Sequence, residues 1–426
     1  MIRIAYSALF IVLLPFMVLR MLLRSRRAPA YRQRLLERFG FFSPPDDARP
    51  CIWIHAVSLG ETLAARPLVE RLLEAFPGHR LLVTTTTPTG SEQVQRLFGD
   101  RVFHVYAPWD TPGAVKRFLK RADPGLLVLM ETELWPNLLH YSKRSGCQIV
   151  LANARLSARS AAGYARLART SREMLGALDW LGAQSSADAD RFLQLGMNPA
   201  RISVTGSIKF DVQLDDEIRD RVEGLREQWA LAQRPVIIFA STHEGEEALA
   251  LSAFAAFKKQ QTSALLLLAP RHPERFDAVY ALCMDAGLQV ARRSQSESVD
   301  ADTELVLLDS LGELSQLFGV ADIAVIGGSF ISRGGHNPLE AAAWGMPVLC
   351  GPSMFNFEDI TERLSEAGGL KRCADEAQLV DQFELLLGDE NEKRRRGAAA
   401  LMVLEKNRGA LNALLTGVKS LLGAHS

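Results

Sequence analysis

The stretch GGSFISRGGHNPLE, residues 327–340, decides how this chain of 426 residues is interpreted. It follows an apolar run, Ala321–Ile326, which predicts a buried parallel strand, and it leads into a predicted helix over Leu339–Trp344. Glycine pairs allow the backbone to approach a ligand, and a helix beginning near Pro338 presents free N–H groups to an anion. We therefore expect a nucleotide here, with Glu340 accepting hydrogen bonds from ribose hydroxyls. The alternative is a glycine-capped turn whose first-turn acid complements the helix dipole.

Short apolar runs alternate with helical segments on both sides of this loop, as in βαβ units. The strands predicted in the first half are Cys51–Val57, Arg80–Thr85, Val102–Tyr106, Leu126–Met130, Gln148–Leu151, Trp180–Ala183 and Ile202–Val204. Those predicted in the second half are Val236–Ala240, Ala264–Ala269, Leu288–Ala291, Leu305–Leu308, Ile323–Ile326 and Val348–Leu349. We predict an α/β chain of two Rossmann-like, doubly wound domains whose strand ends face a common cleft.

Composition restricts the class of protein. Lys and Arg number 49 and so do Asp and Glu, so no overall basic charge points to a nucleic-acid partner. The five cysteines have no paired spacing and several lie in apolar runs, which indicates reduced, buried thiols.

The N-terminal segment departs from this balance. Residues 4–19 carry no charge, while residues 1–40 contain eight arginines and the single acid Glu37. An apolar run followed by arginines predicts a retained membrane anchor whose body stays in the cytoplasm. A cleaved signal peptide is one alternative, because Ala28–Ala30 resembles a cleavage site, although arginines separate it from the apolar run. An amphipathic helix on the membrane surface is another.

Acidic residues follow two strands predicted in the first domain. Ser58 and Glu61 have the spacing of a capping box, which would explain Glu61 without catalysis, but a carboxylate at this strand end also suits a general base. Glu131 and Glu133 follow the buried strand predicted at Leu126–Met130, and an extended backbone would let only one of them face the cleft. Lys209, at the junction between the domains, would add a cation.

The second domain offers cationic and polar groups at its strand ends. His243 could orient a phosphate or be a half-buried polar residue, and Arg271 suits phosphate recognition or is a surface arginine. Ser310–Leu314 forms another strand-to-helix turn whose amides could meet a nucleotide. An Asp-x-Asp triplet, which would hold a metal for a diphosphate leaving group, occurs at Asp188–Asp190 but in a helical stretch. We therefore expect no metal site and no cofactor.

Five motifs together resemble one family. They are Ser58–Thr62, Glu131–Asn137, Gly206–Asp211, Ser241–Glu247 and Gly334–Glu340. They are similar to motifs of the Kdo transferases of lipopolysaccharide core synthesis, and the similarity runs from the anchor to beyond residue 360. Leu59 departs from the frequent valine of the first motif without consequence for the chemistry.

The resemblance implies a GT-B glycosyltransferase on the cytoplasmic face of the inner membrane, in contact with membrane lipids. It would move 3-deoxy-D-manno-octulosonic acid (Kdo) from CMP-Kdo to a lipid A precursor, with inversion. Carried over from the family, Glu61 is the proton acceptor, and Glu131 and Lys209 stabilise the transition state. The CMP contacts carry over to Pro270, Arg271, Leu311, Gly312, Glu313, Asn337, Pro338, Leu339 and Glu340.

The expected organisation follows from these assignments. It comprises an anchor over 1–23, a basic segment over 24–49, an acceptor domain over 50–205, a linker over 206–233, a CMP-sugar-binding domain over 234–405 and a C-terminal helix over 406–426. Two alternatives stay open: another GT-B sugar-nucleotide enzyme, such as a different transferase or an epimerase, and a non-catalytic, membrane-tethered nucleotide-binding protein.

Overall fold

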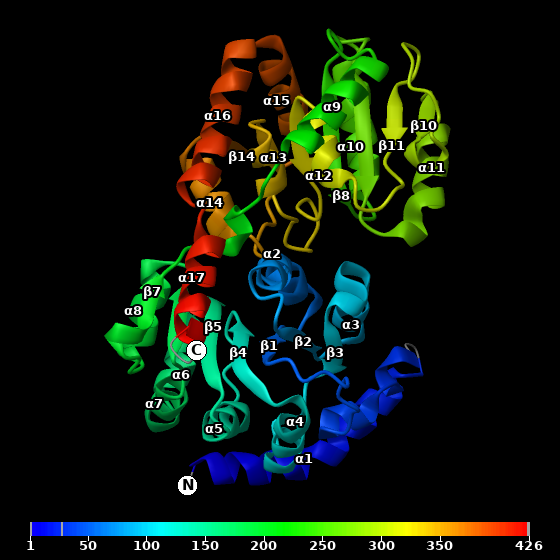
Figure 1. The fold of residues 1–426 in the computed structure, drawn as a ribbon. Coiled ribbons are helices and arrows are strands. Elements are labelled where there is room, and N and C mark those ends of the chain that lie inside the picture. The colour runs from blue at the N-terminus through cyan, green and yellow to red at the C-terminus, as the bar shows by residue number, and fades with distance from the viewer. Residues whose placement is uncertain (1, 27–28, 424–426) are drawn as a thin grey trace. The chain divides into compact units, whose positions relative to one another are not determined.

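A computed structural model describes residues 2–26 and 29–423 of the chain. Contacts divide it into two compact units, each built on its own sheet (Figure 1). Unit 1 comprises Met1–Asp211 and Arg408–Ser426, and unit 2 comprises Val212–Asn407. The chain thus leaves unit 1 once and returns to it for the last helix.

Unit 1 contains a sheet of seven strands in the order β3-β2-β1-β4-β5-β6-β7, and every neighbouring pair is parallel. The strands are β1 (Cys51–His55), β2 (Arg80–Thr85), β3 (Phe103–Tyr106), β4 (Pro124–Met130), β5 (Gln148–Ala154), β6 (Trp180–Ala183) and β7 (Ile202–Val204). Its helices are α1 (Ile2–Arg24), α2 (Leu59–Ala75), α3 (Pro88–Phe98), α4 (Pro112–Ala122), α5 (Pro136–Arg144), α6 (Ala158–Ala165), α7 (Ala168–Gly176), α8 (Ser186–Gln194) and α17 (Ala410–Gly423). Short 3-10 turns are η1 (Pro29–Arg32), η2 (Leu35–Phe39), η3 (Gly99–Arg101), η4 (Pro199–Arg201) and η5 (Ile208–Phe210).

Unit 2 repeats the plan with seven parallel strands in the order β10-β11-β9-β8-β12-β13-β14. The strands are β8 (Val236–Thr242), β9 (Leu265–Pro270), β10 (Val290–Arg292), β11 (Leu305–Leu307), β12 (Ile323–Ile326), β13 (Val348–Cys350) and β14 (Leu370–Arg372). The helices are α9 (Asp216–Gln228), α10 (Glu246–Lys258), α11 (Phe276–Asp285), α12 (Leu314–Leu317), α13 (Leu339–Ala343), α14 (Glu358–Glu366), α15 (Glu376–Gly388) and α16 (Glu390–Lys406). The 3-10 turns are η6 (Pro273–Arg275), η7 (Arg293–Gln295) and η8 (Phe318–Val320).

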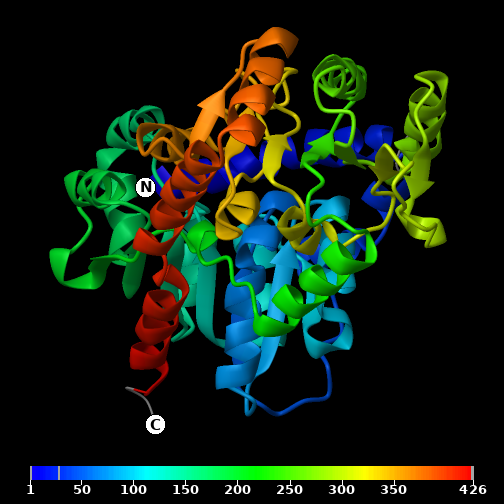
Figure 2. The same cartoon turned by 90° about the horizontal axis from the view of Figure 1, so that it is seen from above.

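Side chains of the strands in unit 1 alternate between two cores, as the pleat of a doubly covered sheet requires. On β1, Trp53 packs with Phe118 of α4 on one face, whereas Ile52 and Ile54 pack with α2 on the other. Helix α17 joins the second core through Leu411, Leu414, Leu415 and Val418. The view from above in Figure 2 shows this last helix at the end of the chain.

The prediction of two doubly wound parallel sheets is confirmed. Each predicted strand is present, although β10 begins two residues later than expected. Strand β14 was not predicted, because this three-residue edge strand buries only Leu370 and has no apolar run. All five cysteines are buried, free thiols, as expected.

Both sheets are parallel throughout, and therefore every loop that follows a strand emerges at one edge of its sheet. In unit 2, the three strands that follow β8 in the chain, β9, β10 and β11, lie on one side of it, and the chain then crosses to β12 on the other side. This reversal is the topological switch point at which doubly wound sheets bind ligands.

Candidate active site

Glu61 lies in the first turn of α2, immediately after β1. The backbone N–H of Val57 donates to its Oε2 at 2.9 Å, and the Ser58 hydroxyl donates to its Oε1 at 3.0 Å. Ser58 also caps the helix by accepting the N–H of Glu61 at 3.3 Å. The capping box is therefore real, and it holds the carboxylate at the carboxyl edge of the sheet.

The pKa of Glu61 nevertheless lies in the range that suits a general base. Its pKa is raised to about 7, mainly by burial and in part by the charges of Glu133 and Glu131, against the lowering effect of the hydrogen bonds from Val57 and Ser58. A general base works best when its pKa lies near the operating pH. The capping contacts thus position a group whose basicity is set mainly by its burial.

The two acids after β4 do not lie on an extended backbone. Glu131 has a φ of 58°, in the left-handed region, and its N–H donates to the Ala152 carbonyl of β5 at 3.0 Å. The extended backbone on which the expectation of a single facing carboxylate depended is therefore absent, and the charges of both acids raise the pKa of Glu61. A left-handed non-glycine residue costs conformational energy and is often found at functional sites.

Glu133 belongs to a chain of buried contacts that the sequence did not reveal. Trp135 Nε1 donates to its Oε2 at 2.7 Å, and the Trp135 ring meets the His55 ring edge-on at 4.8 Å between centroids. His55 is fully buried with Nδ1 2.8 Å from Thr84 Oγ1, and burial lowers its pKa to about 3. The Trp135 indole, packed on a neutral histidine, therefore fixes the Glu133 carboxylate, whose charge raises the pKa of Glu61.

Lys209 lies in η5, within unit 1. Burial lowers the pKa of its ammonium group, and the charge of Glu131 counteracts this. Asn153 at the end of β5 fixes the turn, because its Oδ1 accepts the Ile208 N–H at 3.1 Å. Asn153 itself has a left-handed φ of 54°, and the only hint of its role in the sequence is a polar residue within an apolar run. The charge of Glu131 thus acts on both Glu61 and Lys209.

In unit 2 a buried carboxylate orders the loop after β12. Glu246, only 2 % exposed at the start of α10, accepts the N–H groups of Gly328 at 2.7 Å and of Ser329 and Phe330 at 3.0 Å. The N–H of His243 donates to the same carboxylate at 3.0 Å. Four backbone donors therefore converge on one charge, which ties the end of β8 to the glycine-rich loop.

The glycines of this loop allow the chain to pack closely on itself. A Cβ at Gly327 would collide with the Ser241 carbonyl group, and one at Gly335 would collide with the side chain of Met354. Gly328, Gly334 and Gly335 also have positive φ values of 70°, 85° and 68°. Internal packing and backbone conformation therefore require glycine here, and the approach of the loop to a ligand stays a prediction.

A pair of histidines stands at the same edge. His243 Nε2 lies 2.9 Å from His336 Nε2, so one ring donates and the other accepts. Burial lowers the pKa of both rings, that of His336 to about 3, and the charge of Arg271 contributes. The pair is therefore neutral at neutral pH and lies beside the exposed guanidinium side chain of Arg271.

The remaining predicted CMP contacts follow parallel strands at this edge. Pro270 ends β9, the turn Leu311–Glu313 follows β11, and Asn337–Glu340 form the start of α13. Arg293 binds Glu313 at 2.9 Å, and although burial would raise the pKa of Glu313, the hydrogen bonds from Arg293 and Ser310 lower it. Leu339 is wholly buried, so its side chain belongs to the core. Of this residue, only the backbone is available to a ligand.

The acidic triplets lie elsewhere. Asp188 lies in the first turn of α8, in the helical position expected, and its carboxylate accepts the Leu156 N–H at 2.8 Å and a hydrogen bond from the Ser185 hydroxyl. A second Asp-x-Asp triplet, Asp300–Asp302, escaped the sequence analysis; it precedes β11, and Asp300 accepts hydrogen bonds from Asp302 and Thr303. Among residues 2–26 and 29–423, no cluster of three or more metal-binding side chains occurs.

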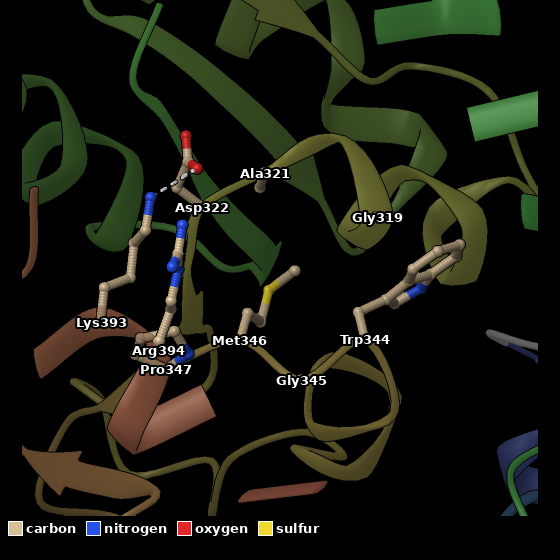
Figure 3. Close-up of a pocket in the computed structure, with 9 residues that line it drawn as sticks. All are labelled: Gly319, Ala321, Asp322, Trp344, Gly345, Met346, Pro347, Lys393 and Arg394. Carbon is tan, nitrogen blue, oxygen red and sulfur yellow. Dashed lines mark hydrogen bonds and ion pairs between the residues drawn. The ribbon is translucent and has the colours of Figure 1, made fainter. Parts of the chain in front are cut away.

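One cavity of about 150 Å³ lies at the amino ends of β12 and β13 (Figure 3). Its lining includes Asp322, Trp344 and Lys393, and an ion pair of 3.1 Å joins Lys393 to Asp322. None of the predicted CMP contacts lines it. It is separate from the carboxyl edge of the sheet.

Solved structures define the class of the fold. The chain resembles a glycosyltransferase from Rickettsia africae, with a TM-score of 0.55 and 15% sequence identity, over 88% of this chain and 99% of that one. It also resembles the UDP-GlcNAc 2-epimerase from Neisseria meningitidis, with a TM-score of 0.56 and 12% identity, over 87% of this chain and 100% of that one. The fold is therefore of the GT-B type.

Sequence relatives identify the family within that class. The chain is 41% identical to the 3-deoxy-D-manno-octulosonic acid transferase of Haemophilus influenzae over 99% of both chains. It is 40% identical to that of Bordetella pertussis over 96% of this chain and 97% of the other. Residues 33–212 match the family model described as 3-deoxy-D-manno-octulosonic-acid transferase (kdotransferase). The chain belongs to the 3-deoxy-D-manno-octulosonic acid transferase family of glycosyltransferases.

The Glu246 contacts predict a large effect on stability. In Glu246→Gln, an amide replaces one carboxylate oxygen and faces backbone donors, so we expect the free energy of unfolding to fall by about 2 kcal/mol or more. Urea denaturation measures this. The control Glu244→Gln, two residues away and exposed, should change it by less than about 0.5 kcal/mol. Equal stability of the two variants would contradict the role given to the buried carboxylate.

The acidic cluster predicts a shift in pH dependence. Glu61 accepts protons only when ionised, so transfer should rise with pH through about 7. Glu133→Gln removes a negative charge, which favours the ionised form of Glu61, and the rising limb of the pH–rate profile should move to lower pH. The exposed control Glu173→Gln should leave the profile in place. If the rising limb of the pH–rate profile is unchanged in Glu133→Gln, or moves to higher pH, this electrostatic coupling is contradicted.

Proposed function

We propose that this chain transfers Kdo from CMP-Kdo to a lipid A precursor, the tetra-acylated lipid IV-A, with inversion at the anomeric carbon. The observation that carries the mechanism is Glu61, a fixed carboxylate whose pKa is raised to about 7 at the carboxyl edge of unit 1. The family supplies the transferred sugar, and the site supplies a base for the acceptor hydroxyl.

The proposed step is a single displacement. The acceptor hydroxyl oxygen attacks the anomeric carbon of Kdo while Glu61 takes the hydroxyl proton. The bond between that carbon and the phosphate oxygen breaks, and CMP leaves with the electron pair. Positive charge develops on the sugar, and the carboxylate of Glu131 can stabilise it. Lys209, held beside Glu131, meets negative charge on the donor.

We assign donor binding to unit 2. Arg271 offers an exposed cation next to the neutral His243–His336 pair, a combination suited to a phosphate monoanion. The backbone of Leu311–Glu313 and the start of α13 at Asn337–Glu340 would contact the nucleoside. Because Arg293 already binds the Glu313 carboxylate, Glu313 contributes to nucleoside binding through its backbone.

The reaction is proposed to need no metal and no cofactor. The leaving group is a nucleoside monophosphate, whose charge side-chain cations and N–H groups can meet. The Asp188 carboxylate is engaged by the Leu156 N–H and the Ser185 hydroxyl. The same transfer assay run with a chelator tests this point, and activity that returns only with a divalent ion would refute it.

The proposed acceptor carries acyl chains and therefore lies in a membrane. The protein has an apolar helix that could attach it to that membrane. Helix α1 has a mean hydropathy of 2.2 over an 18-residue window, long and apolar enough to cross a membrane. We propose attachment to the inner membrane with both units on the cytoplasmic side, where arginines after the helix favour retention. No nucleic acid takes part.

The Glu61 assignment predicts loss of turnover without loss of structure. Glu61→Gln keeps a hydrogen-bond acceptor for Val57 but cannot take a proton, so transfer should fall on the order of 10²-fold or more. CMP-Kdo and lipid IV-A are incubated with each variant, and mass spectrometry detects the Kdo-bearing product. If the wild-type protein incubated with these substrates yields an epimerised sugar nucleotide, or no reaction, an alternative class of protein is supported. Near-normal turnover in Glu61→Gln would reduce Glu61 to a capping residue.

The donor site predicts a change in CMP affinity. Glu340→Ala removes the carboxylate proposed to bind the ribose hydroxyls, so CMP should bind about tenfold or more weakly in calorimetry. The matched control Glu362→Ala, an exposed residue of α14, should bind CMP normally. Unchanged affinity in Glu340→Ala would remove this residue from the nucleotide site.

A further inference from the structure

Helix α1 is held against unit 1 at its first two turns. The Arg3 guanidinium donates to Asn137 Oδ1 of α5 at 2.9 Å and lies 5.2 Å from the Tyr141 ring centroid. The Ser7 hydroxyl, only 6 % exposed, donates to the same Asn137 oxygen at 3.1 Å. These contacts join the start of the helix to the folded body of unit 1.

A buried acid reinforces this attachment. Asp110 accepts the backbone N–H of Asn137 at 3.0 Å and that of Leu138 at 2.7 Å, and it also accepts a hydrogen bond from the Tyr6 hydroxyl. The polar groups at the start of α1 are therefore partners of the loop before α4 and of the start of α5.

The chain after α1 returns to the same unit. Arg34 donates to Ser91 Oγ at 3.1 Å and to the His104 carbonyl at 2.7 Å, and Arg38 donates to the Thr86 carbonyl at 2.9 Å. The segment that follows the helix is thus fixed to unit 1 as well. Figure 1 shows α1 lying along unit 1 beneath α4 and α5.

One stripe of α1 faces the protein along its length. The residues less exposed than their neighbours recur every three or four positions, as one face of a helix requires. They are Arg3, Tyr6, Ser7, Phe10, Leu14, Val18 and Met21. The opposite face is apolar and open, and eleven large hydrophobic side chains of the helix are exposed, among them Val12 at 74% and Phe16 at 66%.

These contacts conflict with a helix that crosses the bilayer. Twenty-three residues make a helix about 35 Å long, and the hydrocarbon core is about 30 Å thick. A crossing helix would carry Arg3 to the far side, and its partners Asn137, Asp110 and Tyr141 belong to a folded body that cannot follow it into hydrocarbon.

We propose that α1 lies in the plane of the membrane interface and seats unit 1 directly on the lipid surface. The open apolar face enters the acyl chains, while the exposed arginines Arg20, Arg24 and Arg26 meet anionic headgroups. Leu36, 67% exposed, and Phe41, 44% exposed, extend the apolar surface beyond the helix. An apolar surface of this extent on a folded unit marks an interaction site, and the basic rim identifies the partner as a lipid surface.

This inference rests on the membrane attachment proposed above, but it concerns orientation and can fail separately. Salt-washed membranes test attachment, because protein absent from the pellet would refute attachment itself. In the protein that remains bound, the side of the membrane from which the start of α1 is accessible then tests the orientation of the helix.

The first experiment labels single introduced cysteines with a membrane-impermeant maleimide in right-side-out and inverted vesicles. The native cysteines are buried, so the background is low. Ile2→Cys reports the start of α1, and Asp100→Cys, on the exposed surface of unit 1, is the matched control. We expect both to be labelled from the same side. Labelling of position 2 only from the side opposite to position 100 would overturn the proposal.

A crosslink decides the result if position 2 is shielded from both sides. Arg3→Cys with Tyr141→Cys, two half-buried neighbouring positions whose replacement leaves Ser7, Asn137 and Asp110 in place, should give an internally linked species after treatment with a short bis-maleimide in native membranes. Val12→Cys with Tyr141→Cys is the control, because Val12 lies on the open face. Linkage of the first pair and not of the second supports the docked helix, and absence of the first linkage contradicts it.

Discussion

The carboxylate of Glu246 accepts four backbone N–H groups, and the course of the glycine-rich loop depends on that convergence. A buried charge is stable only when its hydrogen-bonding capacity is met, and here the donors come from two segments far apart in sequence. Asp110 does the same in unit 1, where it accepts the first N–H groups of α5. Asp211 accepts those of Gly409 and Leu411 where the chain returns to unit 1. Carboxylate acceptors therefore hold in place the loops that the parallel sheets bring together.

Glu61 and Glu246 show how one residue type can serve two purposes. Both stand in the first turn of a helix after a strand, but Glu61 receives one backbone N–H and one hydroxyl, whereas Glu246 receives four N–H groups. Glu61 also lies near two other acids, and its pKa rises to about 7. The number of donors and the neighbouring charges thus separate a candidate base from a structural acceptor.

Much of this arrangement could be predicted from the sequence. Central strands such as β4 and β9 are long apolar runs because both faces are covered, and the acids or cations after them are visible as polar residues in fixed places. The grouping of Glu61, Glu131 and Lys209 followed from parallel strands together with the family motifs. Local pattern could not reveal contacts between distant segments. The four donors to Glu246, the packing of Gly335 against Met354 and the turn fixed by Asn153 all depend on tertiary structure. The short strand β14 was missed because it has too little apolar surface to leave a pattern.

Helix α17 packs into the core of unit 1, although almost two hundred residues of unit 2 separate it from the rest of that unit. During synthesis, unit 2 emerges from the ribosome as one uninterrupted segment, whereas unit 1 waits for the final residues to be translated. Until then, the surface that receives Leu411 and Leu414 stays open to water or to chaperones. Premature termination near residue 408 would consequently damage the half of the molecule that is made first.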